Sequence, residues 1–289
     1  MTVRPTAVVT GANSGIGLET VRGLAREGIH VVMVCRNQTR AEAARADIEA
    51  SVPDASLSIV LCDLSLQADV RRAAAEIEAT KERLDLLVNN AGIMIRSRQV
   101  TTEGVEMMLA VNHFAPFLFT TLLLPLLQAS APARIVNVAS WAHSMGRLDL
   151  DDLQATRGYG LFGLPRYGET KLMNILFTRE LARRIEGTGA IVNCLHPGNV
   201  ATNLGNPPAP NRLLGRMIFL DAARGAETTL AASTNTEYGD VNGSYFVKSE
   251  PGDHKLSAAA RDREAAAGLW VATEALVVSS PLRPHAGPS

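Results

Sequence analysis

The chain has 289 residues, of which 46% are hydrophobic and 20% are charged, and its formal net charge is −1. This length and composition are typical of a folded globular protein with one large core or two small ones. A net charge near zero creates no field that would attract nucleic acid or an anionic membrane, so the sequence predicts neither as a partner.

The three cysteines and the apolar runs narrow the class of protein further. Cys35, Cys62 and Cys194 are far apart, lack C-x-x-C spacing and sit in apolar runs, so we expect buried free thiols, a reducing compartment and no metal site. There is no basic-then-apolar leader. The most apolar stretch, residues 117–127, contains Pro125 and is too short to cross a bilayer. The sequence therefore predicts a cytoplasmic protein without a membrane span.

The first forty residues have the pattern of a dinucleotide-binding unit. An apolar strand at residues 6–10 leads into a glycine-rich turn and then into a helical pattern at residues 18–27. Glycines let the backbone approach a pyrophosphate, which then lies on amide groups at the helix N-terminus. The alternative is a merely tight turn. The residues predicted to hold the cofactor here are Gly11, Asn13, Ser14, Gly15, Ile16 and Gly17.

The second predicted strand, residues 30–35, ends at Arg36. Many NAD sites place an acidic residue at this strand end to hold the ribose hydroxyls, and none is present here. A guanidinium suits a 2′-phosphate instead, so Arg36 favours NADP(H) over NAD(H). The alternative is that Arg36 only caps an exposed loop.

Two later strand ends carry further candidates. The strand at residues 57–61 is followed by Asp63 and Leu64, and we expect Asp63 to accept from the adenine amino group unless it serves as a helix N-cap. The strand at residues 84–88 leads to Asn90, Ala91 and Gly92, which are small enough for a ligand to approach the backbone.

Strand and helix alternate four times with short joins, which predicts an α/β fold with one parallel, doubly wound sheet and helices on both faces, as in a Rossmann fold. No composition break divides residues 1–278, so one domain is expected. Prolines and glycines at residues 199–220 indicate a substrate lid, and residues 279–289 are expected to be a disordered tail. The remaining predicted elements are helices at 40–50, 68–82, 103–127, 167–186, 221–233 and 258–276 and strands at 134–139, 190–195 and 243–247.

Four polar residues in the middle of the chain are candidates for chemistry. Tyr167 and Lys171 are four apart on a predicted helix, so they share one face, and a nearby ammonium lowers the pKa of a phenol toward neutrality. Ser140 follows the strand at residues 134–139. Asn112 lies in an apolar helix, where an amide usually satisfies backbone groups. The neighbouring His113 is interpreted as structural.

Together these motifs resemble the short-chain dehydrogenase/reductase family over residues 5 to about 276. They are Thr10-Gly-x-x-x-Gly-x-Gly17, Asn89-Asn90-Ala91-Gly92, Asn112, Ser140, Tyr167-x-x-x-Lys171 and Pro197-Gly198. The stretches Val34–Asn37, Ser130–Val138, Leu176–Leu181 and His196–Gly198 are similar to its retinol dehydrogenase-like, WW-domain-oxidoreductase-like branch. The membrane-bound retinol dehydrogenases usually carry an N-terminal hydrophobic anchor, which is not seen here, so retinoid specificity is not carried over.

The resemblance implies a mechanism. Tyr167 exchanges a proton with the substrate oxygen, Lys171 lowers the tyrosine pKa and binds the nicotinamide ribose, Ser140 holds the substrate oxygen, and Asn112 binds a relay water. The same resemblance places Pro197, Gly198, Val200 and Thr202 against the nicotinamide. It also implies a homodimer or homotetramer, in which the helices near 105–128 and 167–186 pair between subunits; burial of these helices within one subunit is the alternative.

The predicted function is hydride transfer between NADP(H) and a small carbonyl or alcohol substrate. Apolar residues in the expected lid, such as Leu204 and Phe219, suggest an apolar substrate, although they also suit core packing. One alternative is a cofactor-binding scaffold or redox sensor on the same fold, because fold alone does not determine function. Another is a ketoreductase of a secondary-metabolite pathway.

Overall fold

A computed structural model describes residues 4–198 and 222–278. Its centre is one eight-stranded sheet with the order β3-β2-β1-β4-β5-β6-β7-β8. Neighbouring strands from β3 to β7 are parallel, and only the short β8 is antiparallel to β7. The strands are β1 (Thr6–Thr10), β2 (His30–Cys35), β3 (Ser56–Leu61), β4 (Leu86–Asn89), β5 (Ala133–Val138), β6 (Ala190–His196), β7 (Tyr245–Val247) and β8 (Glu250–Pro251).

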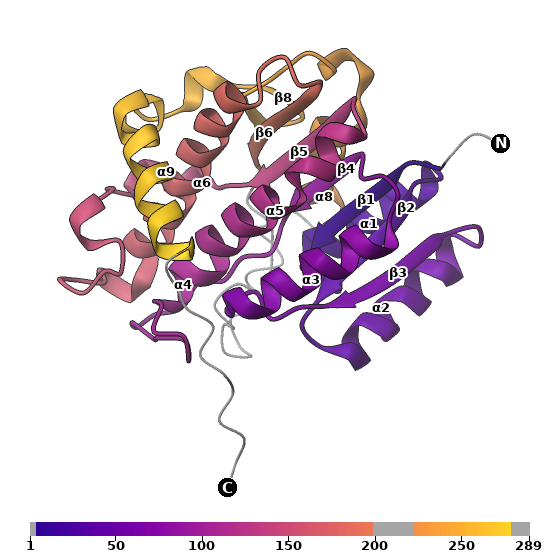
Figure 1. Cartoon of the computed structure of the whole chain (residues 1–289), viewed down its shortest axis with the longest axis horizontal. Helices are drawn as coiled ribbons and strands as arrows, with labels where there is room; N and C mark the ends of the chain where they lie inside the picture. Colours follow the sequence, from indigo (N-terminus) through magenta and orange to yellow (C-terminus); the bar gives the residue numbers. More distant parts are fainter. Residues whose placement is uncertain (1–3, 199–221, 279–289) are drawn as a thin grey trace, which may run out of the picture.

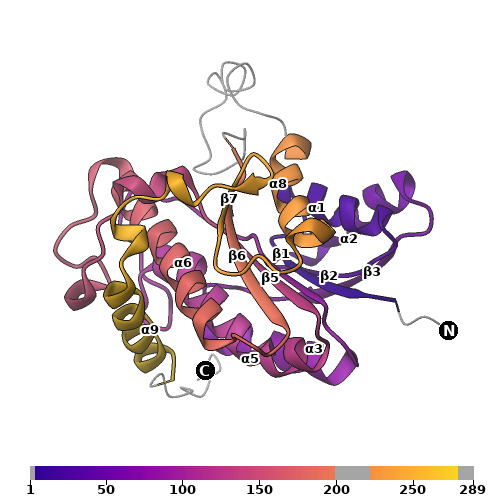
Figure 2. The ribbon, with the colours of Figure 1, turned by 90° about the horizontal axis from the view of Figure 1, so that it is seen from above.

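Helices cover both faces of this sheet, as Figures 1 and 2 show. One apolar core includes residues of α3, α5, α6 and α9, and a second core on the opposite face includes residues of α1, α2 and α8. The helices are α1 (Gly15–Arg26), α2 (Gln38–Ser51), α3 (Gln67–Thr80), α4 (Met107–Leu109), α5 (Ala115–Ala129), α6 (Leu164–Arg184), α8 (Ala222–Thr234) and α9 (Arg263–Val278). The predicted doubly wound α/β fold is confirmed.

The strands read as continuous apolar runs because both of their faces are buried. All five residues of β1 are buried, and they alternate between the two cores: Val8 belongs to one core, whereas Ala7 and Val9 belong to the other. A strand buried on both faces has no polar positions to alternate with apolar ones, which is typical of parallel sheets between two helical layers.

The predicted helix at residues 103–127 is more complicated than its apolar pattern indicated. Its observed counterpart begins at Met107, and a π-helix, η1 (Ala110–Phe114), separates α4 from α5. The stretch Met107–Ala129 has 23 residues, and its most apolar 18-residue window has a mean hydropathy of 1.6, so the argument that the apolar stretch is too short to span a membrane is wrong. In this structure 78% of its most apolar window is buried inside the protein, as in a core helix.

The C-terminal helix α9 covers the helices from which we predicted a homo-oligomer. The Trp270 ring of α9 lies 4.8 Å from the Phe117 ring of α5 and 5.9 Å from the Phe177 ring of α6. The part of this apolar surface that contacts α9 is buried within one chain, which favours the alternative for that part. The oligomeric state stays a prediction. The predicted lid at 199–220 and tail at 279–289 lie outside the described residues.

The prediction that the three cysteines are buried free thiols is confirmed. Cys35, Cys62 and Cys194 are buried free thiols, and burial raises the pKa of Cys35 to about 11 and that of Cys62 and Cys194 to about 12. Within residues 4–198 and 222–278, no group of three or more metal-ligating side chains is found.

Candidate active site

A cavity of about 1160 Å³ opens at the carboxyl ends of the parallel strands. The strand order reverses between β1 and β4, and this switch point is where doubly wound sheets bind ligands. Every described residue predicted to bind the cofactor lines the cavity, and Ser140 lines it too. Asn112 lies behind the wall rather than in it. Val200 and Thr202 fall outside the described residues.

At one end of the cavity the backbone forms a cradle suited to a phosphate. A Cβ at Gly17 would lie 2.3 Å from the Gly11 carbonyl oxygen and 2.5 Å from Asn90 Nδ2, so only glycine permits this approach of α1 to the turn. The N-cap residue Ser14 makes no side-chain capping bond, and the first turn of α1 has no acidic residue. The amide groups at the N-terminus of α1 therefore remain available to bind an anion.

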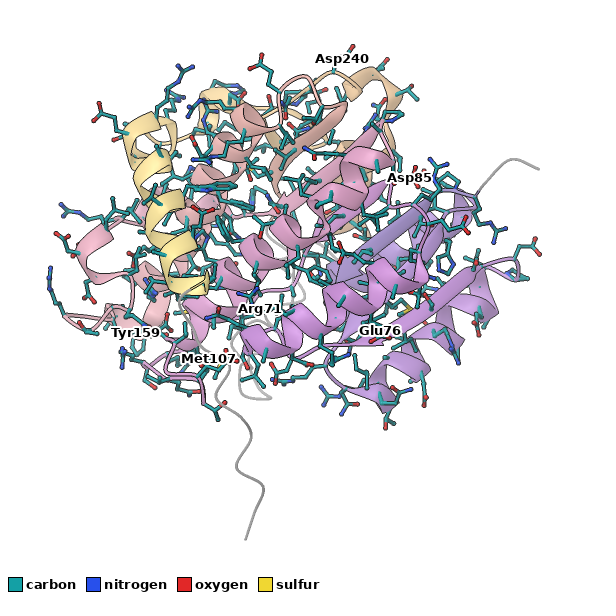
Figure 3. All side chains as sticks on the ribbon, in the orientation of Figure 1. Arg71, Glu76, Asp85, Met107, Tyr159 and Asp240 are labelled. Atoms are coloured by element: carbon teal, nitrogen blue, oxygen red, sulfur yellow. The ribbon has the colours of Figure 1, made fainter. Side chains whose placement is uncertain are left out.

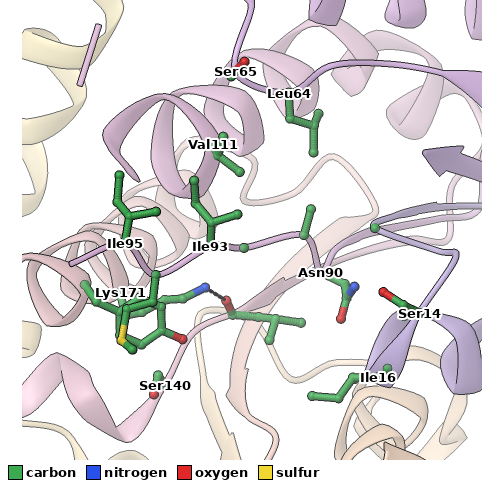
Figure 4. Close-up of a pocket in the computed structure, with 18 of the residues that line it drawn as sticks. Ser14, Ile16, Leu64, Ser65, Asn90, Ile93, Ile95, Val111, Ser140 and Lys171 are labelled. Carbon is green, nitrogen blue, oxygen red and sulfur yellow. Dashed lines mark hydrogen bonds between the residues drawn. The ribbon is translucent and has the colours of Figure 1, made fainter. Parts of the chain in front are cut away.

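The strand β1 fixes the neighbouring wall through Thr10. Thr10 Oγ1 accepts from the amides of Asn90 and Ala91, both at 3.0 Å, and Asn90 Nδ2 donates to the Thr10 carbonyl at 2.9 Å. These bonds hold the loop after β4 against the glycine turn, so the two segments form one rigid surface. Figure 4 shows Asn90 facing Ser14 across this part of the cavity.

Asp63 does not act as the cap of a helix, which was the alternative to its adenine role. Its Oδ1 accepts from the amide of Ser65 at 3.0 Å and from the Ser65 hydroxyl at 2.7 Å, and so it shapes the turn after β3. The N-terminus of α3 is instead capped by Glu103, which accepts from the amides of Gln67 and Ala68. The sequence offered no signal for this long-range cap.

Arg36 lies at the end of β2 on the rim of the cavity and is exposed. Among residues 4–198 and 222–278 it takes part in no ion pair, so its guanidinium has no protein carboxylate to neutralise it. A planar guanidinium can bind an anionic group through two parallel hydrogen bonds.

Ser140, Tyr167 and Lys171 meet at the other end of the cavity. The side chains of Ser140 and Tyr167 both line this part of the cavity, and Lys171 Nζ lies 5.6 Å from the centroid of the Tyr167 ring. Lys171 is 2% exposed, and its Nζ donates to the Val138 carbonyl at 2.9 Å, the dashed bond in Figure 4. The three predicted side chains are therefore brought together as expected.

The expected lowering of the tyrosine pKa is wrong for this structure. Burial raises the pKa of Tyr167 to about 12 and outweighs the opposing effect of the nearby Ser140 side chain. Burial also lowers the pKa of Lys171 to about 8. The pKa of Tyr167 stays high because desolvation of the phenolate outweighs the attraction of the Lys171 ammonium, which lies 5.6 Å from the ring centroid and is hydrogen-bonded to Val138.

Asn112 satisfies backbone groups, as an amide in an apolar helix is expected to. Its Oδ1 accepts from the Ile93 amide at 2.8 Å, and its Nδ2 donates to the Ile93 carbonyl at 2.9 Å and to Thr170 Oγ1 at 3.0 Å. Asn112 is still close to Lys171, because both side chains approach Gly92. A Cβ added at Gly92 would lie 3.2 Å from Lys171 Nζ and 3.6 Å from Asn112 Oδ1. The relay role of Asn112 stays a prediction. His113 is structural as interpreted, since its Nε2 bonds Thr273 at 2.9 Å.

Close contact of two backbones brings Ser140 to Tyr167. A Cβ at Gly168 would lie 2.4 Å from the Ala142 carbonyl oxygen, and one at Gly146 would lie 2.5 Å from the Gly168 carbonyl oxygen. The short 3₁₀-helix η2 (Trp141–Met145), which begins right after Ser140, therefore packs directly on the first turns of α6. Gly168 is a site residue that the motif search missed, although its place beside Tyr167 was a signal.

A buried ionic cluster next to Tyr167 was also missed. Arg166 pairs with Glu106 at 2.8 Å and with Glu169 at 2.7 Å, and the side chains of Arg166 and Glu106 are 1% and 0% exposed. Glu106 also caps α4 through the amides of Met108 and Leu109 and accepts from the Tyr159 hydroxyl. Figure 3 shows Tyr159 near Met107 at this end of the molecule. The cluster joins three segments that surround the start of α6.

The comparisons with known proteins agree with this geometry. The model of the short chain dehydrogenase family matches residues 5–151. The chain belongs to the short chain dehydrogenase family. Retinol dehydrogenase 12 of Mus musculus is 39% identical over 267 residues, which cover 91% of this chain and 83% of that protein. This similarity supports the retinol dehydrogenase-like branch.

Solved structures of family members have the same fold. A structure of an uncharacterised protein from Mycobacterium paratuberculosis superposes with a TM-score of 0.77 at 33% identity and covers 97% of this chain and 96% of its own. An NADPH-bound carbonyl reductase from chicken fatty liver superposes with a TM-score of 0.61 at 25% identity, covering 84% of this chain and 96% of its own. The chain is thus an oxidoreductase of a family that uses nicotinamide cofactors.

Proposed function

We propose that this dehydrogenase transfers hydride between NADP(H) and an apolar carbonyl or alcohol substrate, with Tyr167 as the proton donor or acceptor. The observation that carries the proposal is a continuous cavity in which the phosphate cradle and the Ser140–Tyr167–Lys171 group face one another. The NADPH-bound carbonyl reductase among the structural relatives agrees with this proposal.

The residues present fit a dinucleotide. The turn around Gly11–Gly17 and the uncapped start of α1 would hold the pyrophosphate, and Arg36 would hold a 2′-phosphate. The bonds of Asp63 to Ser65 use only its Oδ1. Its second carboxylate oxygen, Oδ2, would accept a hydrogen bond from the adenine amino group. Lys171 would reach the ribose on the nicotinamide side. When bound, the cofactor supplies or accepts the hydride.

The protein's own part is proton transfer. A pKa of about 12 keeps Tyr167 protonated at neutral pH, as a general acid for carbonyl reduction requires. Ser140 holds the substrate oxygen near the phenol, and the ammonium of Lys171 stabilises the tyrosinate that remains after the proton leaves. A pKa of about 8 leaves most Lys171 side chains charged at pH 7.

Apolar side chains beside the phenol support an apolar substrate. The cavity wall beyond Tyr167 includes Met94, Ile95, Met107 and Trp141. This wall is independent of the lid residues that first suggested the same substrate class. A screen of aldehydes, ketones and alcohols, in which NADPH absorbance is followed, would identify the substrates that the protein accepts.

The first experiment compares Tyr167→Phe with Tyr238→Phe. Tyr238 packs on Phe246, away from the cavity lining, at a ring distance of 5.1 Å, so its variant is a matched control. We expect Tyr167→Phe to abolish turnover and retain NADPH binding, while Tyr238→Phe keeps both. Turnover by Tyr167→Phe would refute the assignment. Tight NADPH binding without turnover by the natural protein would favour the scaffold alternative.

The second experiment tests the cofactor preference. Arg36→Ala should weaken NADPH binding and leave NADH binding little changed, because only NADPH carries the 2′-phosphate. Arg45→Ala is the control, since Arg45 is an exposed α2 residue that pairs with Glu49 at 3.7 Å. If the ratio of the NADPH and NADH affinities were unchanged in Arg36→Ala, Arg36 would not determine the cofactor preference.

A further inference from the structure

His143 links the turn that carries Ser140 to a distant part of the chain. It lies three residues after Ser140 on η2 and is 2% exposed. Its ring packs edge-on against the Tyr245 ring of β7, with a centroid distance of 5.3 Å and an interplanar angle of 68°. No step of the proposed mechanism uses this buried imidazole, so its polar atoms need another explanation.

Both ring nitrogens of His143 have backbone partners. Nδ1 lies 2.7 Å from the Ser140 carbonyl oxygen, and Nε2 lies 3.3 Å from the Ser257 amide nitrogen. A carbonyl oxygen only accepts and a backbone amide only donates, so Nδ1 carries the proton and Nε2 accepts. The ring is therefore neutral and in one tautomer. Burial, which lowers the pKa of His143, favours the same neutral form.

The partner at Ser257 belongs to a segment that is fixed to the sheet. Asp253 Oδ1 accepts from the Tyr245 amide at 2.9 Å, and its Oδ2 accepts from the Ser244 hydroxyl at 3.1 Å. Gly252 donates its amide to the Tyr245 carbonyl at 2.7 Å. Residues 252–257 are thus tied to β7, and His143 is held between this anchor and the Ser140 turn.

The Ser140 turn is also held from two other sides: Ser140 Oγ accepts from the Ala142 amide at 3.2 Å, and η2 packs on the first turns of α6. Strand β5 ends at Val138, and beyond it Ala139 is held by its amide bond to the Leu195 carbonyl. The Ser140 carbonyl also accepts from the His143 amide at 3.2 Å, which is the longer of its two bonds to this residue. The shorter ring bond therefore restrains the peptide plane after Ser140, at the residue whose side chain lies beside Tyr167 in the cavity.

We propose that His143 is a positioning residue that orients Ser140 toward Tyr167 by clamping the Ser140 carbonyl to the 252–257 segment. This inference rests on the proposed function, since Ser140 is the group that holds the substrate oxygen there. The competing explanation is that His143 only fills space against Tyr245. The two explanations differ in whether the Nδ1 bond matters separately from the volume of the side chain.

Two variants of His143 each keep one of its bonds. In His143→Asn the side-chain amide occupies the place of Nδ1 and still donates to the Ser140 carbonyl, whereas the longer side chain in His143→Gln reaches the Ser257 amide and loses the donor to Ser140. His30→Asn is the control, because His30 bonds Ser56 and Ser58 at the start of β2, at the opposite end of the strands from the cavity. Urea unfolding establishes that all three variants are folded.

We expect His143→Gln to lower kcat by about tenfold to a hundredfold, as misplacement of a catalytic group does, with KM for NADPH unchanged. His143→Asn and the His30 control should keep kcat near that of the natural protein. Equal loss in the Asn and Gln variants would show a packing role and overturn the proposal. Crystal structures of the natural protein and both variants give a second readout: a Ser140 hydroxyl that keeps its position relative to Tyr167 in His143→Gln would also overturn the proposal. Because that readout needs no turnover, it separates failure of this inference from failure of the proposed function.

Discussion

Removal of Arg166 should destabilise the fold strongly. Arg166 and Glu106 are 1% and 0% exposed, and the loss of one partner of a buried pair typically costs about 3–5 kcal/mol because an uncompensated charge remains. In Arg166→Met the carboxylate of Glu106 keeps the amides of Met108 and Leu109 and the Tyr159 hydroxyl as donors. These donors limit the penalty, so we expect about 3 kcal/mol, the low end of that range.

Glu106→Gln should cost less than Arg166→Met, because Arg166 keeps Glu169 as a partner at 2.7 Å. Urea unfolding followed by circular dichroism measures both variants. The control is Arg157→Met, since Arg157 pairs with Asp149 at the surface, where side chains are 67% and 49% exposed and such pairs contribute little. If Arg166→Met were as stable as this control, or if Glu106→Gln cost more, the reasoning from burial would be refuted.

Three further predictions concern the site and acid stability. Gly168→Ala should lower kcat more than it weakens NADPH binding, because its Cβ would lie 2.4 Å from the Ala142 carbonyl oxygen and push η2 away from α6; unaltered kinetics would contradict this. Burial lowers the pKa of Lys171 to about 8, so kcat/KM for carbonyl reduction should fall above pH 8 as the ammonium loses its proton, and a level profile there would contradict its role. His113 has its pKa lowered from 6.5 to about 3. The unfolded chain therefore binds this proton at higher pH than the folded protein. As the pH falls from 6.5 toward 3, this group should therefore lower stability by up to about 1.4 kcal/mol per pH unit, and this contribution to the slope should disappear in His113→Gln.

The architecture was largely predictable from local patterns. The strand predicted at residues 30–35 matches β2, and the predicted helix at 40–50 lies within α2 (Gln38–Ser51). The two-residue β8 was missed because so short a segment has no periodicity. The π-helix at Ala110–Phe114 was missed because an apolar helix keeps the same pattern whether or not one turn is widened.

The candidate site was predictable in its members but not in its electrostatics. The spacing of Tyr167 and Lys171 placed them on one helical face, and the structure brings both to the cavity. The pKa of Tyr167 could not be predicted from spacing, because desolvation depends on every segment that packs around the phenol.

By itself, the sequence determined the order of strands and helices, the glycine cradle and the Tyr167–Lys171 pair, since each depends on residues within about one turn of helix or one strand. Only the tertiary structure decided the contacts between distant residues. Glu106 meets Arg166 across sixty positions, His143 meets Ser257 across 114, and α9 covers α5 and α6. Such contacts have no local pattern, because they follow from how the sheet and its two helical layers pack. That packing sets the burial of Tyr167 and Lys171, and burial sets the direction in which their pKa values move.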